Sequence, residues 1–344
     1  MELVLEKLPT DIYLEIESVV QIKGGKNSRI YKAIRKKSSD LIIKQYFKHK
    51  NDKRDRLKTE VTAISFLCRN NIKNIPHLVY SDHEQNIALF EWIDGNPLLP
   101  GHVTYKDIDS VIDFLISIQY LRGNNESQTL PDASEAFFSL KDVLNNVRLR
   151  LYRLLTQGMH GYGKDIITDY LNNKLVPCFQ TIENWCKKQA LTWKIDENEL
   201  LNYDHRILSP SDIGFHNALK LNNGSLVFLD FEYFGWDDPA KMISDFILHP
   251  GMTLPESFKQ YFVSTMITKL NLNGISNRLK LFYPLFGLKW CTILLNEFVQ
   301  SDYERRQFSD IDSVSKFEKL NQQAEKATKQ LELTMTTYER FPYE

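Results

Sequence analysis

The hydrophobic periodicity of this 344-residue chain changes at one stretch rich in glycine and proline. Before that stretch, from about residue 19 to residue 92, short apolar runs of strand type alternate with turn residues. After it, apolar residues recur every three or four positions, as they do on one face of a helix. The stretch itself contains Asp94-Gly95-Asn96-Pro97 and Pro100-Gly101, which interrupt both kinds of structure. The chain therefore divides into a strand-rich part and a helical part.

The first part predicts a small antiparallel sheet with one helix. The strand-type runs cover residues 19–23, 30–34, 41–47, 78–81 and 87–92. Between the third and fourth runs, Leu57, Val61, Ile64 and Leu67 follow one another at helical spacing. This spacing predicts one amphipathic helix over residues 54–69.

The second part is predicted to be mainly helical, so the fold class is α+β. Helical patterns cover residues 111–118, 136–155, 165–187, 254–270, 279–299 and 314–335. We expect the last of these to pack on the same part and not to recruit a partner. Inside this part, Leu219–Leu221 and Leu226–Leu229 flank Asn222-Asn223-Gly224, which predicts a β-hairpin with an Asn-Gly turn.

The charge balance argues against a nucleic-acid partner. The formal net charge is −1, whereas nucleic-acid binders carry a clustered surplus of lysine and arginine. The basic run from Lys48 to Arg56 is interrupted by Asp52 and Asp55, which is typical of a solvated loop or a helix start.

The cysteines and the apolar runs indicate a cytoplasmic protein without a membrane anchor. None of the four cysteines has a spacing suited to zinc, so we expect core thiols in a reducing compartment. Residues 1–10 do not have the pattern of a signal peptide. No apolar run approaches the ~20 residues that a membrane-spanning helix needs.

The residues from Ser209 to Glu232 are the best candidates for chemistry. Asp212 is followed after four residues by Asn217, and Asp230 ends the predicted hairpin. Phosphoryl transfer needs a carboxylate that orients the attacking hydroxyl and oxygen ligands that hold Mg²⁺. Asp212 would be the base, and Asn217 and Asp230 the metal ligands. The alternative is that Asp212 and Asn217 only close turns.

Three features upstream fit the same chemistry. The turn Gly24-Gly25-Lys26-Asn27-Ser28 can bring backbone N–H groups close to phosphate oxygens, although a hairpin turn without a ligand has the same composition. Lys44 would direct an ammonium at the phosphates, and Glu60 on the helix would hold it through an ion pair. Taken singly, Lys44 is typical of an edge strand and Glu60 of a solvent-facing helix position. Their order along the chain favours the functional interpretation.

This ordered set resembles the aminoglycoside phosphotransferase and choline kinase family, itself related to protein kinases, over about residues 19–248. The resemblance implies a bilobal, protein-kinase-like fold. It also implies site residues: Gly24, Gly25, Asn27 and Ser28 in a loop over the nucleotide, Lys44 and Glu60 as an ion pair, Glu91 to Ile93 in the strand that binds adenine through its backbone, Asp212 as catalytic residue, and Asn217 and Asp230 as metal ligands. The turn Gly235-Trp-Asp-Asp-Pro239 resembles the turn that follows the family's metal aspartate.

By this resemblance the chain has two lobes. Residues 1–93 would form the N-terminal nucleotide-binding lobe, residues 94–103 the linker, and residues 104–344 the C-terminal helical lobe that carries catalysis and the substrate.

The chain departs from the family pattern at two places. Pro210-Ser211 stand where the family usually has His-Gly, which puts the supporting hydrogen bonds of the loop in doubt. Met242 stands where the family tends to have an acid, and we expect Asp245 to take over that supporting role. His216 and Glu232 are further supporting candidates, for the loop and for the metal site.

The sequence thus predicts a kinase that transfers the γ-phosphoryl group of ATP, with Mg²⁺, to a hydroxyl of a sugar, amino alcohol or related metabolite. Residues 104–201 contain no clear acidic cluster for a cationic aminoglycoside, so a metabolic or cell-envelope sugar is favoured. A protein kinase would need a longer segment after Asp230 than the few residues before Gly235. A nucleotide-binding pseudokinase with a regulatory or scaffolding role stays open. The sequence gives no signal for an oligomeric state.

Overall fold

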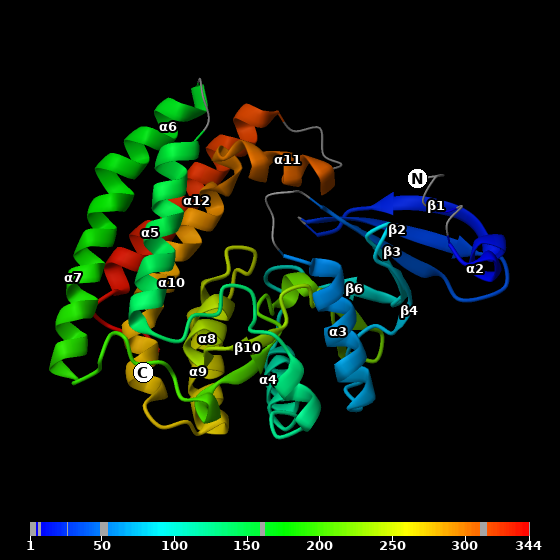
Figure 1. The fold of residues 1–344 in the computed structure, drawn as a ribbon, viewed down its shortest axis with the longest axis horizontal. Coiled ribbons are helices and arrows are strands. Elements are labelled where there is room, and N and C mark those ends of the chain that lie inside the picture. Colours follow the sequence, from blue (N-terminus) through cyan, green and yellow to red (C-terminus); the bar gives the residue numbers. More distant parts are fainter. Residues whose placement is uncertain are drawn as a thin grey trace.

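The computed structural model of the chain describes residues 5, 8–25, 27–48, 54–158, 162–309 and 315–343. Figure 1 shows a sheet at one side of the molecule and a larger group of long helices at the other, with α3 and α4 between them. Most of the predicted basic run from Lys48 to Arg56 lies outside the described residues, as does most of the predicted segment 1–10.

The strand-rich part is an antiparallel sheet, as predicted. Among the described residues it has five strands in the order β1-β2-β3-β5-β4. Their bounds are β1 Ile16–Ile22, β2 Ser28–Arg35, β3 Leu41–Tyr46, β4 Leu78–Asp82 and β5 Ile87–Glu91. Because β3 pairs with a strand on each side, Lys44 is on a central strand, and the edge-strand interpretation of this lysine is wrong.

The predicted helix of this part is α3, Arg56–Arg69. The side chain of Asp55 caps it by accepting a hydrogen bond from the backbone N–H of Lys58. Its apolar face buries Leu57, Ile64 and Leu67, and Glu60 is also buried, at 3% exposure. The solvent-facing interpretation of Glu60 is therefore wrong. A short helix, α2 (Thr10–Glu15), precedes β1.

The stretch predicted as a linker contains a strand. β6, Gly95–Pro97, pairs with β8, Ala218–Leu221, which pairs in turn with β9, Leu226–Phe228. The two latter strands are the predicted hairpin, and Gly224 in its turn has a φ of 84° that favours glycine. The linker therefore adds a third strand to the hairpin that carries Asp230 at its end.

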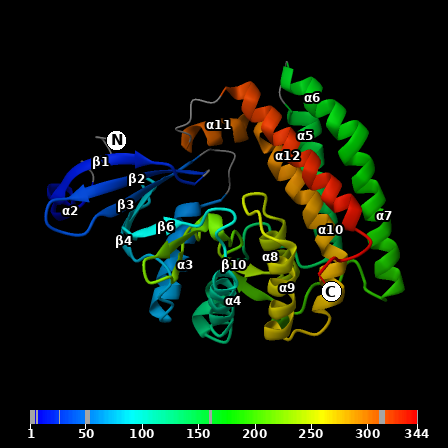
Figure 2. The ribbon, with the colours of Figure 1, turned by 180° about the vertical axis from the view of Figure 1, so that it is seen from behind.

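The second part is mainly helical, as predicted. Its long helices are α4 Tyr105–Gln119, α5 Leu140–Gln157, α6 Tyr162–Tyr170, α7 Val176–Thr192, α9 Glu256–Leu270, α10 Ile275–Leu294 and α12 Lys316–Thr337. A π-helical turn, Leu171–Leu175, joins α6 to α7, and 3-10 turns cover Asn125–Thr129, Tyr203–His205, Phe215–Asn217 and Leu295–Phe298. Figure 2 shows α12 lying along α10, so the last helix packs on its own part, as predicted.

Two further helices, α8 and α11, were not predicted from the sequence. All ten residues of α8, Pro239–Leu248, are buried, including the polar Lys241, Ser244 and Asp245. α11, Gln300–Ser309, is mostly polar. Before α8, the short strands β7 (Ile207–Ser209) and β10 (Gly235–Asp237) form an antiparallel pair. This pair holds the loop of Asp212 next to the turn that opens α8.

One continuous apolar core joins α3 to the helical part, and a smaller cluster covers the other face of the sheet. Trp236 is buried in the main core, and Trp185, Trp193 and Trp290 pack against it. All four cysteines of the sequence are described and carry free thiols. In the part of the chain that the structure describes, no helix is both long and apolar enough to cross a membrane.

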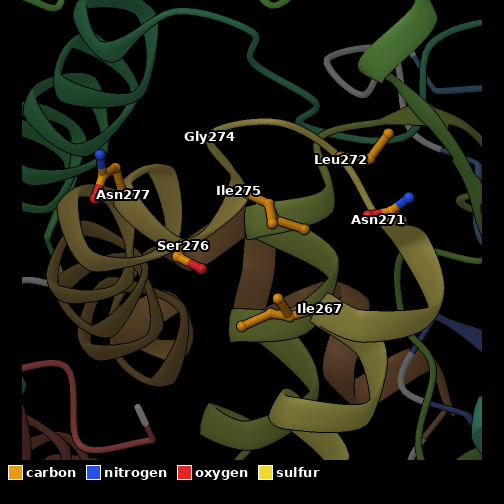
Figure 3. Close-up of a pocket in the computed structure, with 7 residues that line it drawn as sticks. All are labelled: Ile267, Asn271, Leu272, Gly274, Ile275, Ser276 and Asn277. Carbon is orange, nitrogen blue, oxygen red and sulfur yellow. The ribbon is translucent and has the colours of Figure 1, made fainter.

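A pocket lies between the end of α9 and the start of α10 (Figure 3). It is lined by Ile267, Asn271, Leu272, Gly274, Ile275, Ser276 and Asn277. None of these residues belongs to the site predicted from the sequence.

Candidate active site

Lys44 lies among three acidic side chains that come from distant parts of the chain. Its Nζ is 2.6 Å from Oε2 of Glu60, 2.7 Å from Oδ1 of Asp230 and 3.8 Å from Oε2 of Glu232. Glu60 also accepts hydrogen bonds from the hydroxyl of Tyr46 (2.7 Å) and from the backbone N–H of Phe231 (3.2 Å). The central strand, α3 and the end of the hairpin thus meet at one ammonium.

The backbone at Asp230 adopts an uncommon conformation. Its φ is 67°, in the left-handed region that residues other than glycine rarely occupy. Such strain persists only where surrounding contacts hold it, and here the carboxylate contacts Lys44.

Glu232 is the second acid after the hairpin and is buried, at 3% exposure. Its Oε1 accepts a hydrogen bond of 2.6 Å from Nδ2 of Asn27, and Nε of Arg56 lies 3.6 Å from the same oxygen. Asn27 also donates to the hydroxyl of Tyr233 (2.6 Å). The predicted glycine-rich turn is therefore fastened to the residues that follow Asp230.

Burial and charge shift the pKa values of this cluster. Burial alone would lower the pKa of Lys44, but the charges of Asp230, Glu60 and Glu232 outweigh it and raise the pKa above the ordinary lysine value. Burial, together with the charge of Asp230, raises the pKa of Glu232 to about 7. The three acids thus share the positive charges of Lys44 and Arg56.

The turn at Gly24 and Gly25 lies close to the acids. A Cβ on Gly25 would lie 3.6 Å from Oδ2 of Asp230 and 3.4 Å from Oγ of Ser28. A Cβ on Gly24 would meet the side chain of Ile30 at 2.1 Å. Glycine at these positions lets the backbone approach the carboxylate and the sheet closely.

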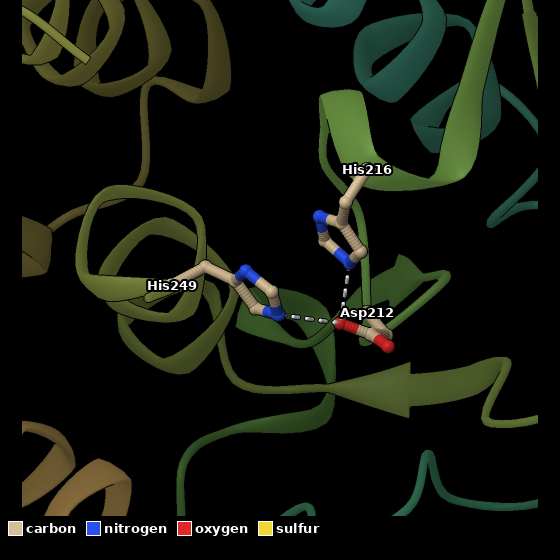
Figure 4. Close-up of side chains that lie close together, drawn as sticks. All are labelled: Asp212, His216 and His249. Carbon is tan, nitrogen blue, oxygen red and sulfur yellow. Dashed lines mark hydrogen bonds and ion pairs between the residues drawn. The ribbon is translucent and has the colours of Figure 1, made fainter. Parts of the chain in front are cut away.

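Asp212 lies in a second cluster, in which two histidines face it (Figure 4). Nε2 of His216 is 3.2 Å and Nε2 of His249 is 3.6 Å from Oδ1 of Asp212. The two imidazole rings stack, with centroids 3.8 Å apart. His216 was predicted as a supporting residue. His249 was not, because a single histidine 37 positions away gives no local signal.

In the loop before Asp212, Pro210-Ser211 stand in place of the family's usual His-Gly. This loop is held by hydrogen bonds with the side chains of Ser209 and Lys241. The backbone N–H of Ser211, whose φ is 67°, donates to Oγ of Ser209 at 2.9 Å. Nζ of Lys241 donates to Oγ of Ser211 (2.7 Å) and to Oδ2 of Asp237 (2.8 Å). Lys241 and Asp237 are both buried, and sequence reasoning missed them because their partners lie on different elements.

Asp245 lies one helical turn beyond Lys241 on α8 and is also buried. It accepts hydrogen bonds from Nε1 of Trp290 (2.9 Å) and Nζ of Lys289 (3.1 Å) on α10. Met242, where the family tends to have an acid, is fully buried in the apolar core. Asp245 thus ties α8 to α10 beside the histidines.

Asn217 links the two clusters. Its Nδ2 donates to the backbone oxygen of Asp212 (2.9 Å), and its own backbone oxygen accepts from the N–H of Leu229 (2.8 Å). Leu229 directly precedes Asp230. The loop of Asp212 and the end of the hairpin are therefore held in one arrangement.

Glu91 and Ile93 lie where β5 passes into β6. The backbone N–H of Glu91 donates to the oxygen of His77, and Oε1 of Glu91 accepts from the N–H of His77 at 3.1 Å. The backbone oxygen of Ile93 accepts from the N–H of Gly95. The side chain of Glu91 therefore closes the start of β4.

The oxygen atoms of the first cluster suit a hard divalent cation. Carboxylate oxygens of Glu60, Asp230 and Glu232 lie within 4.8 Å of one another, and Mg²⁺ prefers oxygen ligands. Of these acids, Asp230 is partly exposed, with 21% of its side chain accessible, while Glu60 and Glu232 are buried.

Solved structures of several small-molecule kinases are similar to this chain over nearly its full length. An ethanolamine kinase from Plasmodium vivax is 15% identical, with a TM-score of 0.62 over 98% of this chain and 86% of that chain. The choline kinase LicA from Streptococcus pneumoniae is 15% identical, with a TM-score of 0.59 over 96% and 98% of the two chains. A spectinomycin phosphotransferase, solved with ADP and spectinomycin, is 16% identical, with a TM-score of 0.58 over 92% and 93%.

No protein-family model matches the sequence, and no curated protein matches it either. The likeness is thus one of structure at low identity, and it agrees with the antiparallel sheet and the larger helical part seen here. The chain has the α+β, kinase-like fold of the choline and ethanolamine kinases and the aminoglycoside phosphotransferases.

Proposed function

We propose that this chain is an ATP- and Mg²⁺-dependent kinase that phosphorylates a hydroxyl group of a small molecule. One observation carries the proposal: Lys44, Glu60 and Asp230 meet at 2.6 and 2.7 Å, and Asn217 ties this cluster to the loop of Asp212. Phosphoryl transfer needs these parts, namely a phosphate-binding ammonium, metal ligands and a carboxylate for the nucleophile. The fold shared with known small-molecule kinases supports the same conclusion.

The nucleotide would bind between the sheet and the hairpin. Gly24, Gly25, Asn27 and Ser28 would cover the phosphates, Lys44 would contact them from the central strand, and the backbone at Glu91 and Ile93 would hold the adenine. Glu60 would keep Lys44 in place through their ion pair. On this proposal residues 1–93 form the nucleotide-binding lobe, and residues 104–344 the catalytic lobe.

Asp230 and Asn217 would hold Mg²⁺, which supplies charge screening for the phosphates when bound. Asp212 would accept the proton of the acceptor hydroxyl and orient its oxygen. Glu232 would support the metal site through Asn27 and Arg56. Asp245 would support the loop from α8.

The acceptor would be a hydroxyl compound such as a sugar, an amino alcohol or a related metabolite. The solved structures with this fold include kinases named for ethanolamine and choline, and a phosphotransferase named for spectinomycin. We propose a metabolic or cell-envelope sugar for this chain, because residues 104–201 lack a clear acidic cluster for a cationic drug. Phosphorylation of kanamycin-type drugs at ordinary turnover would contradict this choice.

The first test is thermal unfolding of the protein with ATP, GTP and ADP, each with and without Mg²⁺. A ligand that binds the folded state raises the melting temperature, so we expect stabilisation by ATP that depends on Mg²⁺. Asp230→Ala should abolish that dependence. Asp212→Ala should keep nucleotide binding and lose turnover with any acceptor. Binding without turnover in the wild type would favour a pseudokinase, and turnover by Asp212→Ala at the wild-type rate would refute the mechanism.

A further inference from the structure

His249 faces Asp212, and the proposed mechanism gives it no role. It caps the C-terminal end of α8, and only 12% of its side chain is exposed. Nε2 lies 3.6 Å from Oδ1 of Asp212, the same oxygen that His216 contacts (Figure 4). Two imidazoles thus converge on one oxygen of the predicted base.

The backbone fixes which nitrogen of His249 carries the proton. The N–H of Gly251 donates a hydrogen bond of 3.0 Å to Nδ1 of His249. A neutral imidazole has one accepting and one protonated nitrogen, so Nδ1 is the acceptor and Nε2 carries the hydrogen. That hydrogen is on the side that faces the carboxylate of Asp212.

The same tautomer argues against a metal ion between Asp212, His216 and His249. A histidine that binds a metal offers a lone pair to it and donates its other N–H to a neighbour. Here the other nitrogen of His249 accepts a hydrogen bond from Gly251, so in a neutral imidazole it carries no hydrogen to donate. The three side chains therefore suit a hydrogen-bonded cluster around a carboxylate.

The surroundings hold the ring in this orientation. Trp290 packs edge-on against His249, with ring centroids 4.7 Å apart, and its indole N–H donates to the buried Asp245. The ring of His216 stacks on that of His249 at 3.8 Å. A Cβ on Gly251 would lie 2.9 Å from Cε1 of His249, so this position must be small for its N–H to reach Nδ1.

We propose that His249 is a positioning residue for Asp212: its Nε2–H holds Oδ1 and thereby orients the carboxylate toward the acceptor hydroxyl. This inference rests on the proposed function, in which Asp212 is the base. The separation of 3.6 Å is longer than a hydrogen bond, and catalytic hydrogen bonds that are long without substrate shorten when the substrates bind. Orientation of the nucleophile is the main task of this carboxylate in phosphoryl transfer.

Two variants of His249 distinguish the contribution of its N–H group from that of its ring. His249→Phe keeps a ring against Trp290 and His216 but has no N–H, whereas His249→Gln keeps an amide N–H of similar reach. We expect His249→Phe to lower kcat at least about tenfold with the KM for ATP changed less than about twofold, and His249→Gln to stay within about threefold of the wild-type kcat. Before an acceptor is identified, the slow Mg²⁺-dependent hydrolysis of ATP, with water as acceptor, supplies the rate.

Gly251→Ala tests the same contact from the backbone, because the added methyl group would displace the ring of His249. It should lower kcat as His249→Phe does. Gly123→Ala is the matched control, since nothing lies within 4 Å of a Cβ at that position. Wild-type kcat in His249→Phe, or an equal loss in the Phe and Gln variants, would overturn the inference.

Nitrogen-15 NMR of the histidine side chains gives a readout that does not depend on turnover. We expect the Nδ1 signal of His249 in the unprotonated range and its Nε2 signal in the protonated range, with Nε2 shifted in Asp212→Asn. The opposite tautomer would overturn the inference in any case. An inactive Asp212→Ala beside a fully active His249→Phe would refute this inference alone, whereas a fully active Asp212→Ala would refute the proposed function and this inference with it.

Discussion

Nζ of Lys44 lies 2.7 Å from Oδ1 of Asp230, although 186 positions separate the two residues in the chain. The contact joins the central strand of the sheet to the end of the hairpin. Glu60 and Glu232 also surround this ammonium, at 2.6 and 3.8 Å. Both the stability of the fold and the proposed nucleotide site therefore depend on Lys44.

Replacing Lys44 with methionine removes this charge and keeps much of the apolar volume. Breaking a buried ion pair leaves the remaining charges uncompensated, so we expect the free energy of unfolding to fall by about 3 kcal/mol. Stabilisation by Mg²⁺ and ATP should be lost as well. Urea unfolding measures the first effect, and thermal unfolding with nucleotide the second.

Lys32→Met is the matched control on the neighbouring strand. Lys32 pairs with Asp40 at 3.0 Å, but both side chains are about a quarter exposed. Pairs of this kind contribute about 1 kcal/mol or less. Equal losses of stability in the two variants would contradict the larger contribution expected from the buried charge of Lys44.

Lys241 is expected to be as important for stability as Lys44. It is paired with the buried Asp237 at 2.8 Å and donates to Ser211 beside Asp212. Lys241→Met should lower the free energy of unfolding by about 3 to 5 kcal/mol, since Asp237 would be left as a buried acid without its partner. Lys220→Met, which breaks the more exposed pair with Asp107, is the comparison in urea unfolding. A smaller loss in Lys241→Met than in Lys220→Met would show that the buried pair does not stabilise the fold.

Gly235 is predicted to tolerate no side chain. A Cβ there would lie 2.3 Å from the backbone oxygen of Pro131 and 2.6 Å from the backbone nitrogen of Ala133. Backbone atoms cannot move aside cheaply, so Gly235→Ala should cost about 2 to 3 kcal/mol of stability. Gly123→Ala, where a Cβ meets nothing within 4 Å, should leave the melting temperature close to that of the wild type. A Gly235→Ala protein with the wild-type melting temperature would disprove the clash.

Glu135 makes a contribution to stability that depends on pH. Burial alone would raise its pKa, but the neighbouring Arg150 and Lys289 outweigh burial and lower the pKa to about 2. An acid with a lowered pKa in the folded state stabilises the fold above its ordinary pKa of about 4.5 and loses this effect as the pH falls toward 2. We expect Glu135→Gln to lose about 2 to 3 kcal/mol at pH 7 and progressively less below pH 4.5.

Urea unfolding of the wild type and of Glu135→Gln at a series of pH values from 7 to 3 measures this difference. Glu199→Gln, at an exposed position, is the control and should follow the wild type. A difference between Glu135→Gln and the wild type that stays constant over the series would contradict the pH dependence.

Local pattern was sufficient to predict most of the elements. Alternation and helical spacing are properties of neighbouring residues, so the five strands of the sheet, the helix α3 and the hairpin at Asn222-Asn223-Gly224 were predicted near their observed bounds. α8 was missed for a physical reason. With ten residues, α8 is shorter than the ~11 residues over which helical periodicity is recognised, and its polar residues Lys241, Ser244 and Asp245 are buried.

The candidate site was predicted only in part, because the contacts of its residues are long-range. The order of Lys44, Glu60, Asp212, Asn217 and Asp230 along the chain indicated a kinase-like site, and the structure brings Lys44, Glu60 and Asp230 together. The assignment of catalytic and metal-binding roles to these residues stays a prediction.

The sequence by itself determined the α+β class, the helix and strand pattern, and the set of residue types that phosphoryl transfer requires. Only the tertiary structure decided that Lys44 is on a central strand, that Lys241 supports the loop of Asp212, and that His249 faces Asp212 from the end of α8. The physical reason is that periodicity records which side of an element is apolar. It carries no information about which distant element packs there, and the partners of a buried charge are set by that packing.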